Sequence, residues 1–289
     1  MSAALAPSAG RRAAELGREL LRHPGIVVGG AILLVVVFFA VFADVLWTID
    51  PQRIQPRARL RPPSDVHWFG GDMVGRDVYS RTVYGARVSL IVGLAVAAIA
   101  VAGGLVIGLL AGFLRGFDAV AMRVMDGLMS IPAILLAVAL IALTGASMGN
   151  VIAAIAISEI PRVARLTRSV VLSIKERPYI EAAIAVGTRF HHLLIRHVLP
   201  NAAAPLLVQG SYIFASAVLV EAALSFIGAG TPPSIPSWGN IIAEGRAVFQ
   251  IAPHIVVFPG IALAATVLAV NLIGDGLRDA FDPRFVGRL

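Results

Sequence analysis

The feature that most constrains this chain is a series of long apolar runs that carry almost no charge. A helix of about 20 mostly apolar residues can cross the hydrocarbon core of a bilayer. The runs cover Ile26–Leu46, Val88–Leu114, Ala119–Leu143, Val151–Leu172, Ala202–Ile227 and Ile255–Ile273. We therefore predict an all-α fold, a polytopic membrane bundle with about six transmembrane helices.

The overall composition agrees with a lipid-facing surface. Hydrophobic residues make up 58% of the chain and charged residues only 14%, with a mean hydropathy of +0.85. Soluble domains are nearer 45–50% apolar and about 25% charged, because their cores need a polar shell. The net charge is +7. Its cations mostly flank the apolar runs, without the aromatic interleaving that binds single strands, so we expect no nucleic-acid partner.

The first run could be either a secretory signal or a permanent anchor. Val41-Phe42-Ala43 is a passable cleavage site, and four arginines precede the run. However, Ile26–Leu46 is longer than the usual apolar region of a signal peptide, which is roughly 7–15 residues. We predict an uncleaved anchor.

Lysine and arginine positions predict the orientation. With the N-terminus inside, 16 of the 24 basic residues lie on the inner side. The first outer loop holds seven of the other eight, which strains the positive-inside rule, and its acids offset this only partly. The basic segment Ile174–Asn201 would then be cytoplasmic, so we expect both termini to be cytoplasmic.

Several chemistries are excluded by what the sequence lacks. There is no cysteine, and the single lysine, Lys175, is followed by Glu176, so no Gly-Lys-Ser/Thr phosphate loop exists. No catalytic motif appears either, and we expect no enzyme activity and no cofactor on this chain. If transport is driven by ATP, then ATP and Mg²⁺ bind to partner subunits.

A proton-coupled carrier or a channel would need ionisable groups deep in the membrane. Glu159 is expected near the inner interface and Glu221 near the outer end of its run, as a helix-end carboxylate; neither forms a convincing proton relay. The adjacent pair His191-His192 lacks the i,i+4 spacing of a metal pair, so no metal site is expected. A secondary transporter or a channel is kept as the alternative function from another class of protein.

The segment 178–201 has its own pattern. Pro178 and Glu181 suit the first turn of a short helix, and Gly187 ends or bends it. Thr188 can cap a second short helix, which Pro200 would stop before Asn201 caps the next span. Small residues form one surface (Ala182, Ala183, Ala185), and an apolar stripe follows at helical spacing (Phe190, Leu193, Leu194, His197). The residues alone allow either docking onto a protein or an amphipathic helix on the lipid surface.

The same segment resembles the EAA motif of ABC importer membrane subunits, through Glu181-Ala182-Ala183, Gly187 and Leu199-Pro200. His197 departs from the usual isoleucine. Further stretches are similar to the C-type subunit of dipeptide, oligopeptide and nickel permeases: GRDVYS (75–80), GARVSL (85–90), EAALSFIG (221–228), PSWG (236–239), PG (259–260) and NLIGDGLRDAFDP (271–283). The likeness covers about 68–284. Ile160 and Val163 depart from it where the family often has aromatic residues.

This resemblance implies a type I ABC importer permease in the bacterial inner membrane. The partners would be a second, B-type permease subunit in a heterodimer, one or two P-loop ATPase subunits, an extracytoplasmic substrate-binding protein, and membrane lipid. Peptides are the implied substrate, with nickel chelates or haem as alternatives. The implied ATPase-coupling residues are Glu181, Ala182, Ala183, Gly187, Phe190, Leu193, Leu194, His197, Leu199 and Pro200.

We accordingly expect five segments along the chain. Residues 1–25 would be a cytoplasmic N-terminal segment, 26–47 the first transmembrane helix and 48–85 an extracytoplasmic loop. Residues 86–276 would form the transmembrane core of five helices, including the coupling segment 178–200. A cytoplasmic tail would follow at 277–289.

Overall fold

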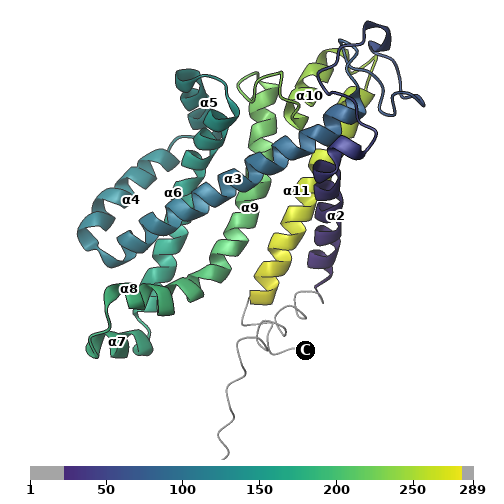
Figure 1. The fold of residues 1–289 in the computed structure, drawn as a ribbon. Helices are drawn as coiled ribbons and strands as arrows, with labels where there is room; N and C mark the ends of the chain where they lie inside the picture. The colour runs from purple at the N-terminus through teal and green to yellow at the C-terminus, as the bar shows by residue number, and fades with distance from the viewer. Residues whose placement is uncertain (1–22, 282–289) are drawn as a thin grey trace, which may run out of the picture.

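The computed structural model describes residues 23–281. Within them every secondary-structure element of three or more residues is a helix (Figure 1). The α-helices are α2 (Pro24–Val41), α3 (Val78–Phe113), α4 (Arg115–Met129), α5 (Ala133–Thr144), α6 (Met148–Lys175), α7 (Pro178–Ala185), α8 (Phe190–Leu193), α9 (Leu199–Phe226), α10 (Trp238–Gly245) and α11 (His254–Phe281). Short 3₁₀ turns lie at Ala43–Val45, Pro56–Ala58 and Arg246–Val248, and a π-helix covers Leu194–Val198. The predicted all-α membrane fold is confirmed.

Four helical stretches are long and apolar enough to cross a membrane: α2, α3, α11, and α9 together with the π-helix before it. The pair α4 and α5 would give a fifth span if it crosses as one unit, but it bends by 92°. Helix α6 is long enough, yet it is not among these spans, because Glu159 and three arginines lie along it. The structure therefore supports four or five spans, and a count of six stays a prediction.

The expected run Ala119–Leu143 is not one helix. Helix α4 ends at Met129 and α5 begins at Ala133, with Pro132 in the extended cap position before it. Proline has no backbone N–H and clashes with the preceding turn, so a helix breaks at this residue. The prediction of a continuous third span is corrected to a sharply bent pair.

Helix α3 begins ten residues before the expected apolar run. Asp77 caps it, because its carboxylate accepts the Ser80 backbone N–H at 2.8 Å and the Ser80 hydroxyl at 2.6 Å. The loop expected at 48–85 thus ends at residue 77. Periodicity alone missed this start because the first two turns of α3 carry polar residues.

Glycines let the long helices approach closely. On α3, Gly104, Gly108 and Gly112 recur every four residues, and a Cβ atom on any of them would lie 2.4–2.5 Å from an atom of α6. On α2, a Cβ atom on Gly29 would lie 2.5 Å from the Ala269 carbonyl oxygen of α11. Small residues at this spacing are typical of helix pairs in membranes, where close van der Waals packing replaces the hydrophobic effect.

The molecule has two distinct ends (Figure 1). One end carries α10 and the loop between α2 and α3. The other carries α7 and α8, together with the first turn of α2 and the last turn of α11. The candidate coupling segment and the polar loop therefore lie on opposite sides of the bundle.

Candidate functional site

Helix α7 has the start and the end that the sequence predicts. Pro178 opens it and Glu181 lies in its first turn. Gly187 follows it with φ +80°, a left-handed conformation that favours glycine, and the Thr188 N–H donates to the Ala183 carbonyl at 3.0 Å. This bond is the long one of a Schellman cap. The predicted bend at Gly187 is confirmed.

The second half of the segment differs from the prediction. The Arg189 carbonyl, not Thr188, begins α8 by accepting the N–H groups of His192 and Leu193. The helix then does not stop at Pro200 but widens into the π-helix and continues as α9. Pro200 has no backbone N–H to donate to the preceding turn, and the wider turn of the π-helix accommodates the missing hydrogen bond. Asn201 donates its side-chain amide to the His197 carbonyl at 2.6 Å instead of capping a new helix.

The predicted stripe is buried or half-buried where the structure describes it, and the side chain of Phe190 lies outside the described part. Leu193 is buried with Ile180 and Val198 against the end of α6, and Leu194 packs partly on the same cluster. His197 is half-buried beside the Tyr179 ring, with ring centroids 6.0 Å apart. Leu193 thus fixes the segment to its own chain.

The exposed surface of the segment is made by other residues. Glu181, Ala182, Gly187, Leu199 and Pro200 are exposed as a docking role requires, and Ala183 is half-buried. Three large side chains outside the predicted set are also exposed, Tyr179 at 45%, Val186 at 86% and Ile195 at 66%. Val186 was missed because it stands at a helix end, and Ile195 because the π-helix shifts the helical face by one residue.

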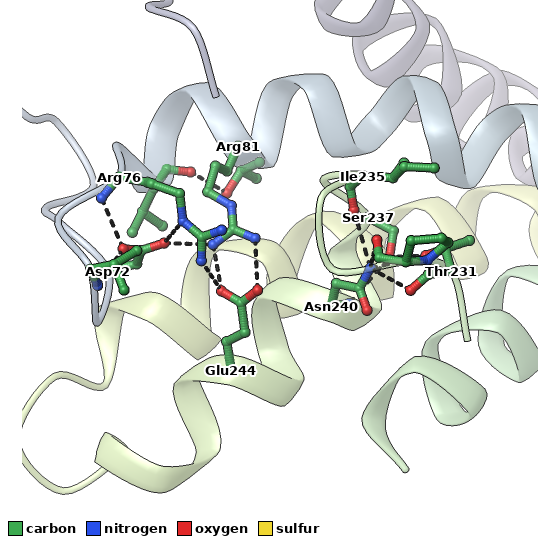
Figure 2. A network of polar contacts seen from close by, with 12 residues as sticks. Asp72, Arg76, Arg81, Thr231, Ile235, Ser237, Asn240 and Glu244 are labelled. Carbon is green, nitrogen blue, oxygen red and sulfur yellow. Dashed lines mark hydrogen bonds and ion pairs between the residues drawn. The ribbon is translucent and has the colours of Figure 1, made fainter. Parts of the chain in front are cut away.

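At the opposite end, α10 joins two polar clusters (Figure 2). Arg81 is 1% exposed, and its guanidinium contacts Asp72 and Glu244 at 2.6 Å each. Arg76 pairs with the same two carboxylates. Two arginines and two acids, drawn from the loop, α3 and α10, thus neutralise each other, with Asp72 and Arg81 buried and Arg76 and Glu244 half-buried.

The pKa of Asp72 is held below its ordinary value of 3.8. Burial alone would raise this pKa, but the charges of Arg81 and Arg76 and hydrogen bonds from the Arg76 and Val74 backbone N–H groups outweigh it. Asp72 is therefore an anion at neutral pH, and it fixes the loop to the first turn of α3.

The second cluster lies one turn away on α10. The Asn240 amide donates to the carbonyls of Thr231, Pro232 and Ile235 at 3.0–3.1 Å, which shapes the loop before α10. Thr231 reaches Glu221 of α9 at 3.2 Å. Glu221 lies near the end of α9 as expected, but it is fully buried, and its Oε2 makes no hydrogen bond within residues 23–281.

The remaining candidates have structural partners. Glu159, expected at the interface, is buried and pairs with Arg162 at 2.7 Å. Lys175 donates to the Gly112 carbonyl at 3.0 Å and lies over the Phe113 ring, so it joins the ends of α6 and α3. Within residues 23–281 no group of three or more potential metal ligands occurs.

Comparison with known proteins identifies the family. Residues 104–287 match the binding-protein-dependent transport system inner membrane component, and residues 13–63 match the N-terminal transmembrane domain of oligopeptide transport permease C. The chain is 56% identical to the probable peptide ABC transporter permease protein y4tQ of Sinorhizobium fredii, covering 91% of this chain and 90% of the relative.

Two further relatives have more specific names. The chain is 41% identical to the dipeptide transport system permease protein DppC of Alkalihalophilus pseudofirmus, over 93% of this chain and 89% of that protein. It is 40% identical to the glutathione transport system permease protein GsiD of Pectobacterium atrosepticum, over 93% and 90%. These matches confirm the resemblance and overturn the alternative of a secondary transporter or channel. The chain belongs to the binding-protein-dependent transport family, as a non-catalytic, multi-pass inner-membrane permease subunit of a peptide ABC transporter.

Proposed function

We propose that the segment 178–200 couples this permease to an ATPase subunit on a separate chain. One observation carries the proposal: the exposed surface of α7 presents Glu181 beside the small side chains of Ala182 and Ala185, is followed by the left-handed Gly187, and lies at the end of the bundle away from the loop between α2 and α3 (Figure 1). A short helix with such a face fits a groove on another protein. Glu181 and Ala182 would lie in the contact, with Val186 and Ile195 beside it.

The test uses the conformation of Gly187. A Cβ atom there would meet nothing within 4 Å, so a substitution acts through φ alone. Leucine in a left-handed conformation costs roughly 1–2 kcal/mol, whereas asparagine tolerates it. Gly187→Leu should therefore weaken ATPase binding by roughly 5- to 30-fold and reduce peptide uptake. Gly187→Asn is the matched control and should retain both.

The readout is recovery of the ATPase and of the partner permease, measured separately after purification from membranes. The membrane helices do not share the α7 contact, so recovery of the partner permease should not change. If Gly187→Leu retains wild-type ATPase recovery and uptake, the segment does not couple, and an amphipathic helix on the lipid surface explains it better.

The remaining partners follow from the family. A binding-protein-dependent system needs a substrate-binding protein and an ATPase, and we propose a B-type permease as the second half of a heterodimer. The chain carries no phosphate-binding loop, so ATP and Mg²⁺ would bind to one or two kinds of ATPase subunit. We also propose that both termini are cytoplasmic and that the chain keeps the expected division into segments 1–25, 26–47, a loop, a core and 277–289, with the boundary between loop and core moved from 85/86 to 77/78, where α3 begins.

Short peptides are the proposed substrate. The relatives are named for dipeptide and glutathione transport, which favours short peptides over nickel chelates or haem. Purification of the binding protein with its natural cargo tests this directly. Recovery of a nickel complex or haem instead of peptide would contradict the assignment.

A further inference from the structure

A cavity of about 240 Å³ lies between α2, α3, α10 and α11, towards the outer end of the bundle. Phe39 of α2 and Ile261 of α11 stand at its mouth, 36% and 61% exposed. Both helices are candidate membrane spans. The medium outside this mouth is therefore hydrocarbon, unless another protein covers it.

The walls offer nothing to a polar ligand. Only three lining side chains carry a polar atom, and each is already satisfied within the chain. The Tyr79 hydroxyl donates to the Leu46 carbonyl at 3.1 Å, the Thr82 hydroxyl to the Val78 carbonyl at 2.7 Å, and the Trp238 indole N–H to the Thr82 carbonyl at 2.9 Å. An apolar cavity of this kind stays dry, and one of about 150 Å³ already binds benzene. A peptide or an ion is therefore a poor occupant.

The depth of the cavity fits one leaflet. Val36 lies five residues before the end of α2, which is about 7–8 Å along the helix. Beyond that end stand Trp47 and Trp68, both exposed, with Trp68 against Tyr79 at 4.8 Å between ring centroids. Exposed tryptophans mark the headgroup level of a bilayer. The mouth thus opens just below that level, where acyl chains begin.

We propose that this cavity is a binding site for one acyl chain of an outer-leaflet phospholipid. The stacked rings of Phe69 and Phe258, with centroids 3.9 Å apart, bound the cavity where the outer loop meets α11. An acyl chain seated there contacts α2, α3 and α11 at once and fills the space beneath α10. The assignment to the outer leaflet rests on the proposed orientation, in which the end of the bundle that carries α10 faces outward.

The test uses the complete transporter in vesicles of phosphatidylethanolamine and phosphatidylglycerol. The probe is a phospholipid that carries a diazirine on its acyl chain, and labelled positions are mapped by mass spectrometry. Ala262→Phe places a ring in the cavity and should lower labelling around Phe39 and Phe258 by about tenfold, because that ring takes the place of the chain. Ala264→Phe, on the exposed side of the same helix, is the matched control and should leave labelling unchanged.

Val36→Phe fills the cavity from the opposite wall and should reproduce the loss, which guards against a folding defect particular to Ala262→Phe. Recovery of the ATPase and the partner permease shows that each variant is assembled. Equal labelling in the Ala262→Phe and Ala264→Phe variants would show that the probe reacts only from bulk lipid, and would overturn the proposal. A photoreactive amino acid placed at Phe39 that crosslinks to the partner permease, with no lipid labelling of the cavity, would overturn it too.

Discussion

Arg81 shows what a single residue contributes to the outer end of the bundle. It is buried, and one of its two carboxylates, Glu244, is supplied from 163 residues later in the chain. Removing one partner of a buried ion pair typically costs about 3–5 kcal/mol, because the other charge is left uncompensated. We expect Arg81→Met to cost about that much, and Arg81→Met with Asp72→Leu to cost less than the two single changes added together. Thermal unfolding of the purified complex measures this, and additive losses would show that the charges are not coupled.

Asp72 also predicts a pH dependence. Its pKa in the folded chain lies below its ordinary value of 3.8, because Arg81 and Arg76 outweigh the effect of burial. The stabilisation from this carboxylate is therefore fully present above pH 3.8 and is lost as the pH falls through the lower, folded value. The unfolding midpoint of the wild-type protein should fall more steeply below pH 3.8 than that of Asp72→Asn, whose amide does not titrate there. Parallel curves would contradict the role of Asp72.

At the scale of the elements, the contact of α3 with α6 depends on its glycines. A Cβ atom on Gly108 would lie 2.5 Å from the Ala164 carbonyl oxygen, so Gly108→Ala must push the two backbones apart. Overpacking of this kind costs about 1–3 kcal/mol. Gly127→Ala in α4 is the matched control: nothing lies within 4 Å of its Cβ, and alanine favours a helix by about 0.5–1 kcal/mol. Unfolding midpoints should therefore move in opposite directions, and a neutral Gly108→Ala would rule out close packing there.

The sequence predicts the elements better than their boundaries. Long apolar runs identify α2, α3, α9 and α11, because a helix that crosses lipid must be mostly apolar along its whole length. Boundaries depend on single atoms: Asp77 caps α3 early, Pro132 breaks a run, and Pro200 is absorbed by a π-helix. Residue type alone does not show whether a proline ends a helix, as Pro132 does, or is tolerated within one, as Pro200 is.

Across the whole molecule, the same limit applies to the candidate site. The motif predicts Glu181 and Gly187, which are local in sequence, and the structure gives them the expected start and bend. It does not predict that Leu193 is buried, because its partners Ile180 and Val171 belong to other elements. Exposure of Val186 and Ile195 likewise follows from the tertiary arrangement.

The structure also bears on the arginine-rich loop that strains the charge rule. Arg76, Arg81 and Arg87 all pair with carboxylates, Arg87 with Asp44 at 2.7 Å. Acids count little in the positive-inside rule, so these pairs fix three arginines in place without removing the strain, and the proposed orientation rests on the basic coupling segment.

Single cysteines test this orientation, because the chain has none of its own. Ser64 and Ser234 are exposed in the two loops of one end, whereas Ser237 caps α10 and is fully buried, so it makes a poor probe. In intact cells, Ser64→Cys and Ser234→Cys should react with an impermeant thiol reagent. Val186→Cys and Thr188→Cys, at the other end, should be protected until the membrane is opened. Protection at Ser64 with reaction at Val186 would reverse the topology, place both termini outside, and remove the coupling segment from the reach of any cytoplasmic ATPase.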